Sequence, residues 1–365
     1  MSLDVFFILF IYLIFIGIFI SDKRRKTKII LLCLGPILIQ SLRSPTCGTD
    51  VWGNGFGYYQ TFTFISEIPL KLILTEKVYS YEQGYVLFNK LLSYISDNPQ
   101  IFLSLTSVLI FSLIGYIYYR FSENVFLSVI IFVCFGLYVF SFTGLRQAIA
   151  FSITFFSLKF IIKRQLVYFL ICVLVAFSIH SSAIIYMFVW PLWNIKHTNK
   201  LAIKLLLLIL LLLPFYKTIF SFIVPLLFRE KYLTYMNGAS SINLILLYLL
   251  IYILPFFIKS QDFSVSNEVY ENDLRYKVAN FIRWMVFCSL LFQSLGLIGG
   301  DSITRIAYYF SIFFPLYIPL IFKTSEVKNV IYTCITILFI AFFYYDSSKE
   351  FYNVVPYLFF WDIIY

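Results

Sequence analysis

Hydrophobic residues occur in long runs along this chain, and short charged or Pro/Gly-rich breaks separate them. The runs cover 3–20, 29–42, 100–119, 124–142, 146–162, 166–179, 182–193, 201–213, 215–228, 242–258, 278–298, 304–322 and 329–345. A helix needs about 20 apolar residues to cross a bilayer, and several runs approach that length. The pattern predicts an all-α polytopic integral membrane protein with about 10–12 transmembrane helices, in a single transmembrane domain over 1–365.

Composition excludes a soluble protein. Of the 365 residues 61% are hydrophobic and 13% are charged, whereas soluble domains have about 45–50% apolar and about 25% charged residues. The net charge of +10 does not indicate nucleic acid, because the basic residues are scattered between apolar runs. Membrane lipids are therefore expected partners. The distribution of the basic residues indicates which loops lie on which side of the membrane.

The charge distribution predicts which loops face the cytoplasm. The first apolar run precedes the basic stretch SDKRRKTK, the reverse of the charge order of a signal peptide, so it reads as a first membrane helix. The positive-inside rule then places the N-terminus outside. Alternating from there puts 17 Lys and Arg inside and 10 outside, with Arg283 within a helix. Residues 43–98 become an extracytoplasmic segment and 259–277 a cytoplasmic loop.

Two further features concern architecture. Within the outer segment, Glu82–Ser96 has helical apolar spacing but is too short and too polar to span. It predicts a short amphipathic helix that is interfacial or re-entrant. No internal repeat is evident, which argues against a transporter built from inverted repeats.

A set of polar residues gathers on the predicted outer side, at the outer ends of helices or in outer loops. They are Arg43, Gly48-Thr49-Asp50, Glu82, Arg146-Gln147, His180 and Asp301 with Arg305. A charge within a membrane helix costs about 2.5–3.5 kcal/mol on insertion scales, so such residues are kept where they have a role or a partner. Their common side indicates one outer site.

Two arginines follow glycines at predicted helix starts. Arg146 follows Gly144, and it is either an interfacial anchor that extends to the headgroups or a phosphate ligand at a helix N-terminus. Arg305 repeats the arrangement after a double glycine. Asp301 is either part of that site, a salt-bridge partner of Arg305, or a helix cap.

Three residues are candidates for a general base. His180 lies in an apolar stretch and is either a packing residue or a proton acceptor. Glu82 begins the amphipathic helix, and Asp50 is a base or the cap of a turn. Spacing does not choose among them. The other histidine, His197, lies in the basic stretch NIKHTNK and is expected to be solvated.

Absent motifs narrow the chemistry. The sequence has no DxD motif, no His/Cys/carboxylate cluster and no Walker-type glycine loop, so no metal and no cofactor are expected. Any substrate phosphate would be held by arginines. The 29 tyrosines are typical of belts at the membrane surface, and some outer ones could stack on sugars.

The ordered motifs resemble a known family. They are Arg43, Gly48-Thr49-Asp50, Tyr58-Tyr59, Glu82-Gln83-Gly84-Tyr85, Leu145-Arg146-Gln147-Ala148-Ile149-Ala150, His180-Ser181-Ser182-Ala183, Arg305 with Tyr308-Tyr309, and Pro356-Tyr357. Their order, from about 43 to 357, is similar to that of the EpsG-like branch of the Wzy polysaccharide polymerases.

The resemblance implies an enzyme of the bacterial inner membrane whose active site faces the periplasm or exterior. Such enzymes join undecaprenyl-diphosphate-linked oligosaccharides into O-antigen, capsule or exopolysaccharide, and a chain-length regulator protein is a further possible partner. The diphosphate would be held by Arg146 and Arg305, assisted by Arg43. His180 would be the first choice of base, ahead of Glu82 and Asp50. Further substrate contacts would come from Gln147, Tyr85 and Tyr309.

Two other functions remain open at this point. An O-antigen ligase would use the same donor but transfer the chain to a lipid A core. A flippase for lipid-linked oligosaccharides would place its charges in a central cavity reachable from both sides, whereas these charges cluster outside. A purely structural protein would leave that cluster unexplained.

Overall fold

The computed structural model describes residues 4–53, 56–212, 215, 241–258, 274–347 and 352–362. Within these ranges the secondary structure is helical, without strands, apart from one isolated antiparallel bridge between Arg43 and Phe359. The predicted all-α class is confirmed. The described residues form two compact units, which lie within Met1–Phe156, Leu174–His180 and Asn329–Tyr365 (unit 1) and within Ser157–Val173 and Ser181–Lys328 (unit 2).

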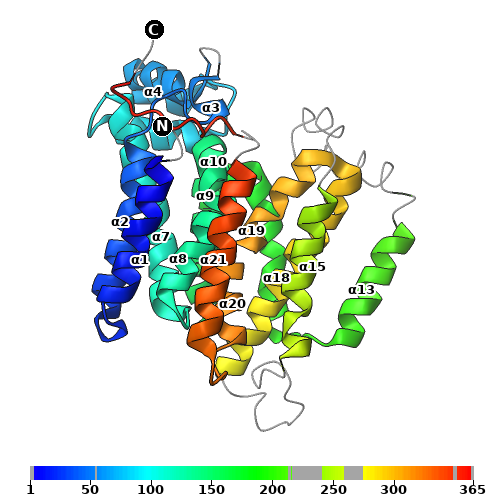
Figure 1. The fold of residues 1–365 in the computed structure, drawn as a ribbon. Coiled ribbons are helices and arrows are strands. Elements are labelled where there is room, and N and C mark those ends of the chain that lie inside the picture. Colours follow the sequence, from blue (N-terminus) through cyan, green and yellow to red (C-terminus); the bar gives the residue numbers. More distant parts are fainter. Residues whose placement is uncertain are drawn as a thin grey trace. The chain divides into compact units, whose positions relative to one another are not determined.

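Unit 1 is built on long apolar helices. They are α1 (Asp4–Phe19), α2 (Arg25–Ser41), α7 (Pro99–Phe121), α8 (Val125–Cys134), α9 (Leu137–Thr143), α10 (Leu145–Phe156) and α21 (Lys328–Ser347). The helix α7 packs against both α2 and α10. In Figure 1, α1, α2 and α7 lie side by side, with α3 (Thr49–Trp52) and α4 (Tyr58–Glu67) at one end of them.

Local sequence signals explain where several of these helices begin. The Asn98 side chain accepts a hydrogen bond from the Gln100 amide at 2.8 Å, and Pro99 occupies the first turn of α7, where no amide donor is needed. Asn124 caps α8 in the same way. Gly136, with φ of 81°, separates α8 from α9, and Gly144 separates α9 from α10. The helix start predicted after Gly144 is confirmed.

The described residues of segment 43–98, which is predicted to lie outside, form four short helices. They are α3 (Thr49–Trp52), α4 (Tyr58–Glu67), α5 (Leu70–Thr75) and α6 (Gln83–Ser93). The predicted amphipathic helix is α6, and it buries Val86 against Ile65 and Ile73 of the neighbouring helices. The other three helices were not predicted. Helices α3 and α5 are too short to show an apolar period, whereas α4 was missed although it buries Tyr58, Phe62 and Ile65 at helical spacing.

Unit 2 contains the first half of α12 and most of the second half of the chain. Its elements are α11 (Leu158–Ile162), α12 (Leu166–Ile179), the 3₁₀ helix η3 (Ser181–Asn194), α13 (Asn199–Leu212), α15 (Ile242–Phe257), α18 (Leu274–Ile306), α19 (Tyr308–Ser311) and α20 (Phe314–Ile321). Gly300, with φ of 68°, interrupts α18, so the double glycine does break the helix before Arg305.

The described residues contain four helices long and apolar enough to cross a membrane. Three bent helix pairs raise the number to seven if each pair is one span. The protein is therefore a multi-pass membrane protein, with fewer spans by this criterion than the 10–12 predicted. Two apolar helices, α12 and α15, are shorter than the criterion requires. The predicted crossing over 215–228 and most of the loop 259–277 lie outside the described residues.

Hydrogen bonds between helix ends agree with the predicted alternation of sides. Arg25 at the start of α2 donates to the carbonyls of Tyr118 and Tyr119 at the end of α7. At the opposite ends, Gln100 of α7 donates to the Ser41 carbonyl at 2.6 Å. The two helices are thus antiparallel, as successive membrane crossings must be.

Candidate functional site

An ion pair in unit 1 joins two of the predicted site residues. Arg146 is the second residue of α10, and Glu82 is the residue that immediately precedes α6. The guanidinium Nη1 donates to the Glu82 carboxylate, and the two side chains are only 12% and 9% exposed. The outer segment and a membrane-spanning helix therefore meet at a nearly buried pair of opposite charges.

Three tyrosines surround this pair, and we call Tyr58, Tyr81 and Tyr85 the tyrosine cage. The Arg146 guanidinium carbon lies 4.0 Å from the centre of the Tyr81 ring, with Tyr85 at 5.8 Å and Tyr58 at 6.0 Å. Their negative ring faces stabilise the cation. Tyr58 is also hydrogen bonded to the guanidinium. Burial raises the pKa of Tyr81 to about 12, which keeps this phenol neutral.

Sequence reasoning found Tyr85 but missed Tyr81. The abundance of tyrosine predicts belts at the membrane surface and does not single out Tyr81. The available signal was spacing, since Tyr81 and Tyr85 are four residues apart around the head of the amphipathic helix, where their rings lie 5.6 Å apart.

The loop that carries Asp50 is held beside the start of α10. The Thr49 amide donates to the Thr143 hydroxyl at 2.9 Å. Gly48 has φ of 102°, and a Cβ atom there would lie 2.5 Å from the Phe142 carbonyl oxygen, so only glycine fits. Asp50 itself is half-buried in the first turn of α3.

A second close contact brings the end of α12 to the head of α6. A Cβ atom on Gly84 would lie 2.6 Å from the carbonyl oxygen of Ser178. Ser178 precedes the half-buried His180 by two residues, and Gly84 follows Glu82 by two. One end of unit 1 thus gathers the segments that carry Asp50, Glu82, Arg146 and His180. Gln147, next to Arg146, is buried there.

Arg43 lies deeper at the same end. Its side chain is fully buried, and its guanidinium carbon is 4.6 Å from the centre of the Phe142 ring. Its three side-chain nitrogens have no hydrogen-bond partner among the described residues. Burial lowers the pKa of Arg43 to about 10. Its predicted contact with a diphosphate stays a prediction.

The two remaining predicted residues belong to unit 2. Arg305 is exposed and lies one helical turn after the exposed Asp301. The Tyr309 side chain is buried, and its hydroxyl is 2.9 Å from that of Ser182. Their part in one site with Arg146 remains a prediction.

The interpretation of His197 as a solvated residue was wrong. It is only 5% exposed, and its ring packs 4.6 Å from the Trp284 ring. Its amide donates to Asn280, and its Nε2 lies 3.3 Å from the Tyr252 hydroxyl. Burial, and then the charge of Arg283, lower the pKa of His197 to about 3. The basic residues around His197 in the sequence indicated a solvated position, whereas its imidazole packs against aromatic side chains.

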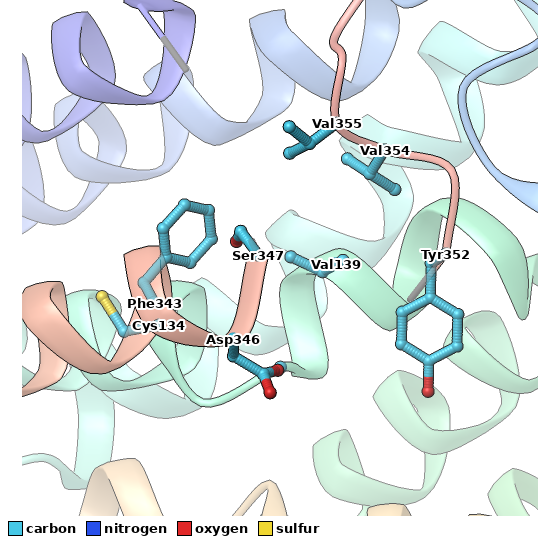
Figure 2. A pocket seen from close by; sticks show the side chains of 9 residues that line it. Cys134, Val139, Phe343, Asp346, Ser347, Tyr352, Val354 and Val355 are labelled. Carbon is cyan, nitrogen blue, oxygen red and sulfur yellow. The ribbon is translucent and has the colours of Figure 1, made fainter. Parts of the chain in front are cut away.

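Other parts of the described chain offer little for chemistry. No group of three or more His, Cys, Asp or Glu residues suited to a metal ion occurs within the described ranges. A cavity between the end of α21 and the start of α9 (Figure 2) is lined by Cys134, Asp346 and Tyr352, among others. Its volume of about 30 Å³ suits a single water molecule rather than a sugar.

Comparisons with known proteins agree with the motif order. No curated protein and no solved structure matches the chain significantly. The EpsG family matches over residues 26–359, which include every candidate site residue. This match indicates a polysaccharide-polymerase type of role. It covers far more than half of the sequence, and the chain therefore belongs to the EpsG family.

Proposed function

We propose that this protein is a metal-independent glycosyltransferase that joins undecaprenyl-diphosphate-linked repeat units into a polysaccharide on the outer face of the bacterial inner membrane. The observation that carries the proposal is the Arg146–Glu82 pair inside the tyrosine cage. It combines a phosphate-binding group, a proton acceptor and aromatic faces that suit sugar rings. Family membership supports the same role.

The proposed reaction is a displacement at the anomeric carbon of the donor. A hydroxyl of the acceptor sugar forms a bond to that carbon, while the bond from the carbon to the diphosphate oxygen breaks. The electron pair leaves with the undecaprenyl diphosphate, and the hydroxyl proton passes to a base. Negative charge grows on the diphosphate, so a guanidinium held in place beforehand lowers the barrier.

The ion pair suggests how donor binding could activate the base. A diphosphate that binds Arg146 replaces the Glu82 carboxylate on the guanidinium. A carboxylate that loses its cationic partner is a stronger proton acceptor. This exchange moves Glu82 ahead of His180 as our choice of base, and His180 remains the alternative.

Exchanging the charges of Glu82 and Arg146 tests whether the pair acts in catalysis or only stabilises the fold. Glu82→Gln alone leaves a nearly buried Arg146 without its partner, which costs about 3–5 kcal/mol for a buried pair. The double variant Glu82→Arg with Arg146→Glu restores a pair of opposite charges. In the wild type and in this variant alike, one of the two helix N-termini carries the carboxylate and the other the guanidinium, so the helix-dipole contributions are similar. We expect this variant to accumulate like the wild type yet make no polymer.

The measurement is the surface polysaccharide ladder on a gel, at matched protein abundance in a host that lacks the native gene. Loss of the ladder with single-repeat material retained indicates a polymerase, whereas loss of all capped lipid A indicates a ligase. A normal ladder from the exchanged variant would show that the pair is only structural.

A further inference from the structure

A groove runs between α2 and α7 on the surface of unit 1, away from the candidate site. Its volume is about 420 Å³, within the range of about 300–1,000 Å³ common for ligand sites. The two helices lie close together beside it at Gly115 and Cys33, since a Cβ atom on Gly115 would be 2.9 Å from Cys33 Sγ. The lining also includes Ile29, Ile30, Ile37, Phe111, Tyr116 and Tyr119.

The groove opens toward the hydrocarbon of the bilayer. Ile30 is 57% exposed and Tyr116 is 39% exposed, and both lie on apolar helices of the membrane-spanning set. Apolar walls left empty lose the dispersion contacts that packed atoms would give. A hydrocarbon chain is the occupant that restores them.

One end of the groove is positively charged. Lys26 lines it, and Lys23, Arg24 and Arg120 are exposed at the same helix ends. Lys26 has no ion-pair partner among the described residues.

Of the other charges at this end, Lys23, Arg24 and Arg120 lie outside the lining of the groove, and the remaining ones are engaged by other groups. Arg25 donates to carbonyls at the end of α7, and Glu123 lies near it. Asp22 is paired with Lys28 at 2.7 Å. Lys26 is thus the cation placed to meet an anionic headgroup above the apolar groove.

We infer that this groove binds an anionic phospholipid, with one acyl chain between α2 and α7 and its phosphate on Lys26. Basic pockets between membrane helices on the cytoplasmic side are a known mode of anionic lipid recognition. The inference does not depend on the proposed reaction. The headgroup end of the groove carries Lys26, at the opposite end of α2 from Ser41, beyond which the candidate site lies. The polyprenyl substrate would therefore have its diphosphate at the wrong end.

Photolabelling in nanodiscs tests the inference. The probes are phosphatidylglycerol and phosphatidylcholine, each with a diazirine in its acyl chain, at equal amounts in a phosphatidylcholine bilayer. We expect peptides containing Ile30 and Tyr116 to be labelled several-fold more by the phosphatidylglycerol probe. Lys26→Gln should abolish this preference, whereas Lys23→Gln, in the same turn region but outside the lining, should retain it.

A second test fills the groove with a larger side chain. Ser112 is exposed and lines the groove, so Ser112→Phe should reduce labelling by both probes. Thr333→Phe, an equally exposed polar position near the start of α21, is the matched control and should leave labelling unchanged. Equal labelling by the two probes in the wild type, or equal losses in Ser112→Phe and Thr333→Phe, would overturn the inference. So would competition by undecaprenyl phosphate but not by phosphatidylglycerol.

Discussion

Two arginines at the candidate-site end of unit 1, the nearly buried Arg146 and the fully buried Arg43, have opposite surroundings. Arg146 has a carboxylate, a tyrosine hydroxyl and an aromatic face within reach. Arg43 has the Phe142 ring but no hydrogen-bond partner among the described side chains. A guanidinium can exchange one anionic partner for another only where an anion can reach it. Of the two, Arg146 is the better placed to exchange Glu82 for a substrate phosphate.

Substitution by lysine tests whether Arg146 and Arg305 bind the diphosphate through paired hydrogen bonds. Lysine keeps the charge and the long stem but cannot donate two parallel hydrogen bonds to phosphate. We expect Arg146→Lys and Arg305→Lys to lose most polymerisation, by at least tenfold, while the protein still inserts. Chain-length distributions at matched membrane abundance measure this.

The control for these variants is Arg120→Lys, at the exposed end of α7 and far along the helix from the Gln100 end. It should make normal polymer. An interfacial anchor acts through its charge and stem, which lysine also has. Wild-type polymer from Arg146→Lys would therefore support the anchor interpretation and remove Arg146 from the proposed donor site.

His197 makes the stability of unit 2 depend on pH. Its pKa is lowered to about 3 in the folded protein, against about 6.5 in an unfolded chain. The unfolded state therefore binds an extra proton between these values, so stability is complete above pH 6.5 and falls as pH drops toward 3, by up to about 1.4 kcal/mol per pH unit. We expect the thermal unfolding midpoint in detergent to fall between pH 6.5 and 4.5.

The variant His197→Gln removes the titrating group and should flatten this part of the pH profile. Its midpoint at pH 8 is expected to be lower than that of the wild type, because the contacts with Trp284 and Tyr252 change. A wild-type profile that is flat over the same range, or an unchanged slope in the variant, would contradict the prediction.

Short elements of the outer segment are anchored by glycine. Gly48 needs a positive φ and also lies against the Phe142 carbonyl, whereas Gly53 has φ of 51° and nothing within 4 Å of an added Cβ atom. An alanine at Gly53 would be strained by about 1–2 kcal/mol, the cost of the left-handed conformation. Gly48, with φ of 102° and ψ of 123°, lies outside that region, and an alanine there would also clash with the backbone before α10.

We therefore expect Gly48→Ala to lose polymerisation and to unfold at a clearly lower temperature than Gly53→Ala. The clash displaces the loop of Asp50 from the start of α10, where Arg146 lies. Thermal unfolding in detergent and the polysaccharide ladder are the two measurements. Equal behaviour of the two variants would mean that the contact with Phe142 is not needed.

The sequence predicted the long elements well and the short ones poorly. Apolar runs located α7, α15 and α21 within a few residues, because a membrane helix must keep its apolar character over its whole length. Glycines marked the breaks at Gly144 and Gly300. Helices α3 and α5 carry too few residues for a period to appear. The ten-residue α4 does bury one face at helical spacing, a signal that the sequence prediction missed.

Some residues of the candidate site could likewise be predicted from the sequence, and others could not. The charged residues stood out in the sequence because apolar runs make charges rare, and two of them, Glu82 and Arg146, do form a pair. Tyr81 did not stand out among 29 tyrosines. The burial of His197 was equally hidden, because it depends on Trp284 and Tyr252, which are distant in sequence.

In the molecule as a whole, the ends of the membrane helices fall into two groups, one for each face of the membrane. The contacts pair the ends consistently: residues near Arg25 meet those near Tyr119, and Ser41 meets Gln100. Contacts alone do not distinguish inside from outside. The excess of Lys and Arg on the side of Arg25 predicts that this side is cytoplasmic, through the positive-inside rule.

Cysteine labelling in intact cells tests this orientation. Single cysteines at Thr75, Lys77 and Asn98 should react with a membrane-impermeant maleimide, since these exposed positions lie in the predicted outer segment. Cysteines at the exposed Asp22 and Thr27 should react only after permeabilisation. Of the six native cysteines, Cys33, Cys47 and Cys134 are buried, and the other three lie within apolar helices, Cys172 in α12, Cys288 in α18 and Cys334 in α21, so the wild type should give a low background. Labelling of Asp22→Cys from outside would invert unit 1, and with it the outer placement of Glu82 and Arg146 on which the proposed polymerase depends.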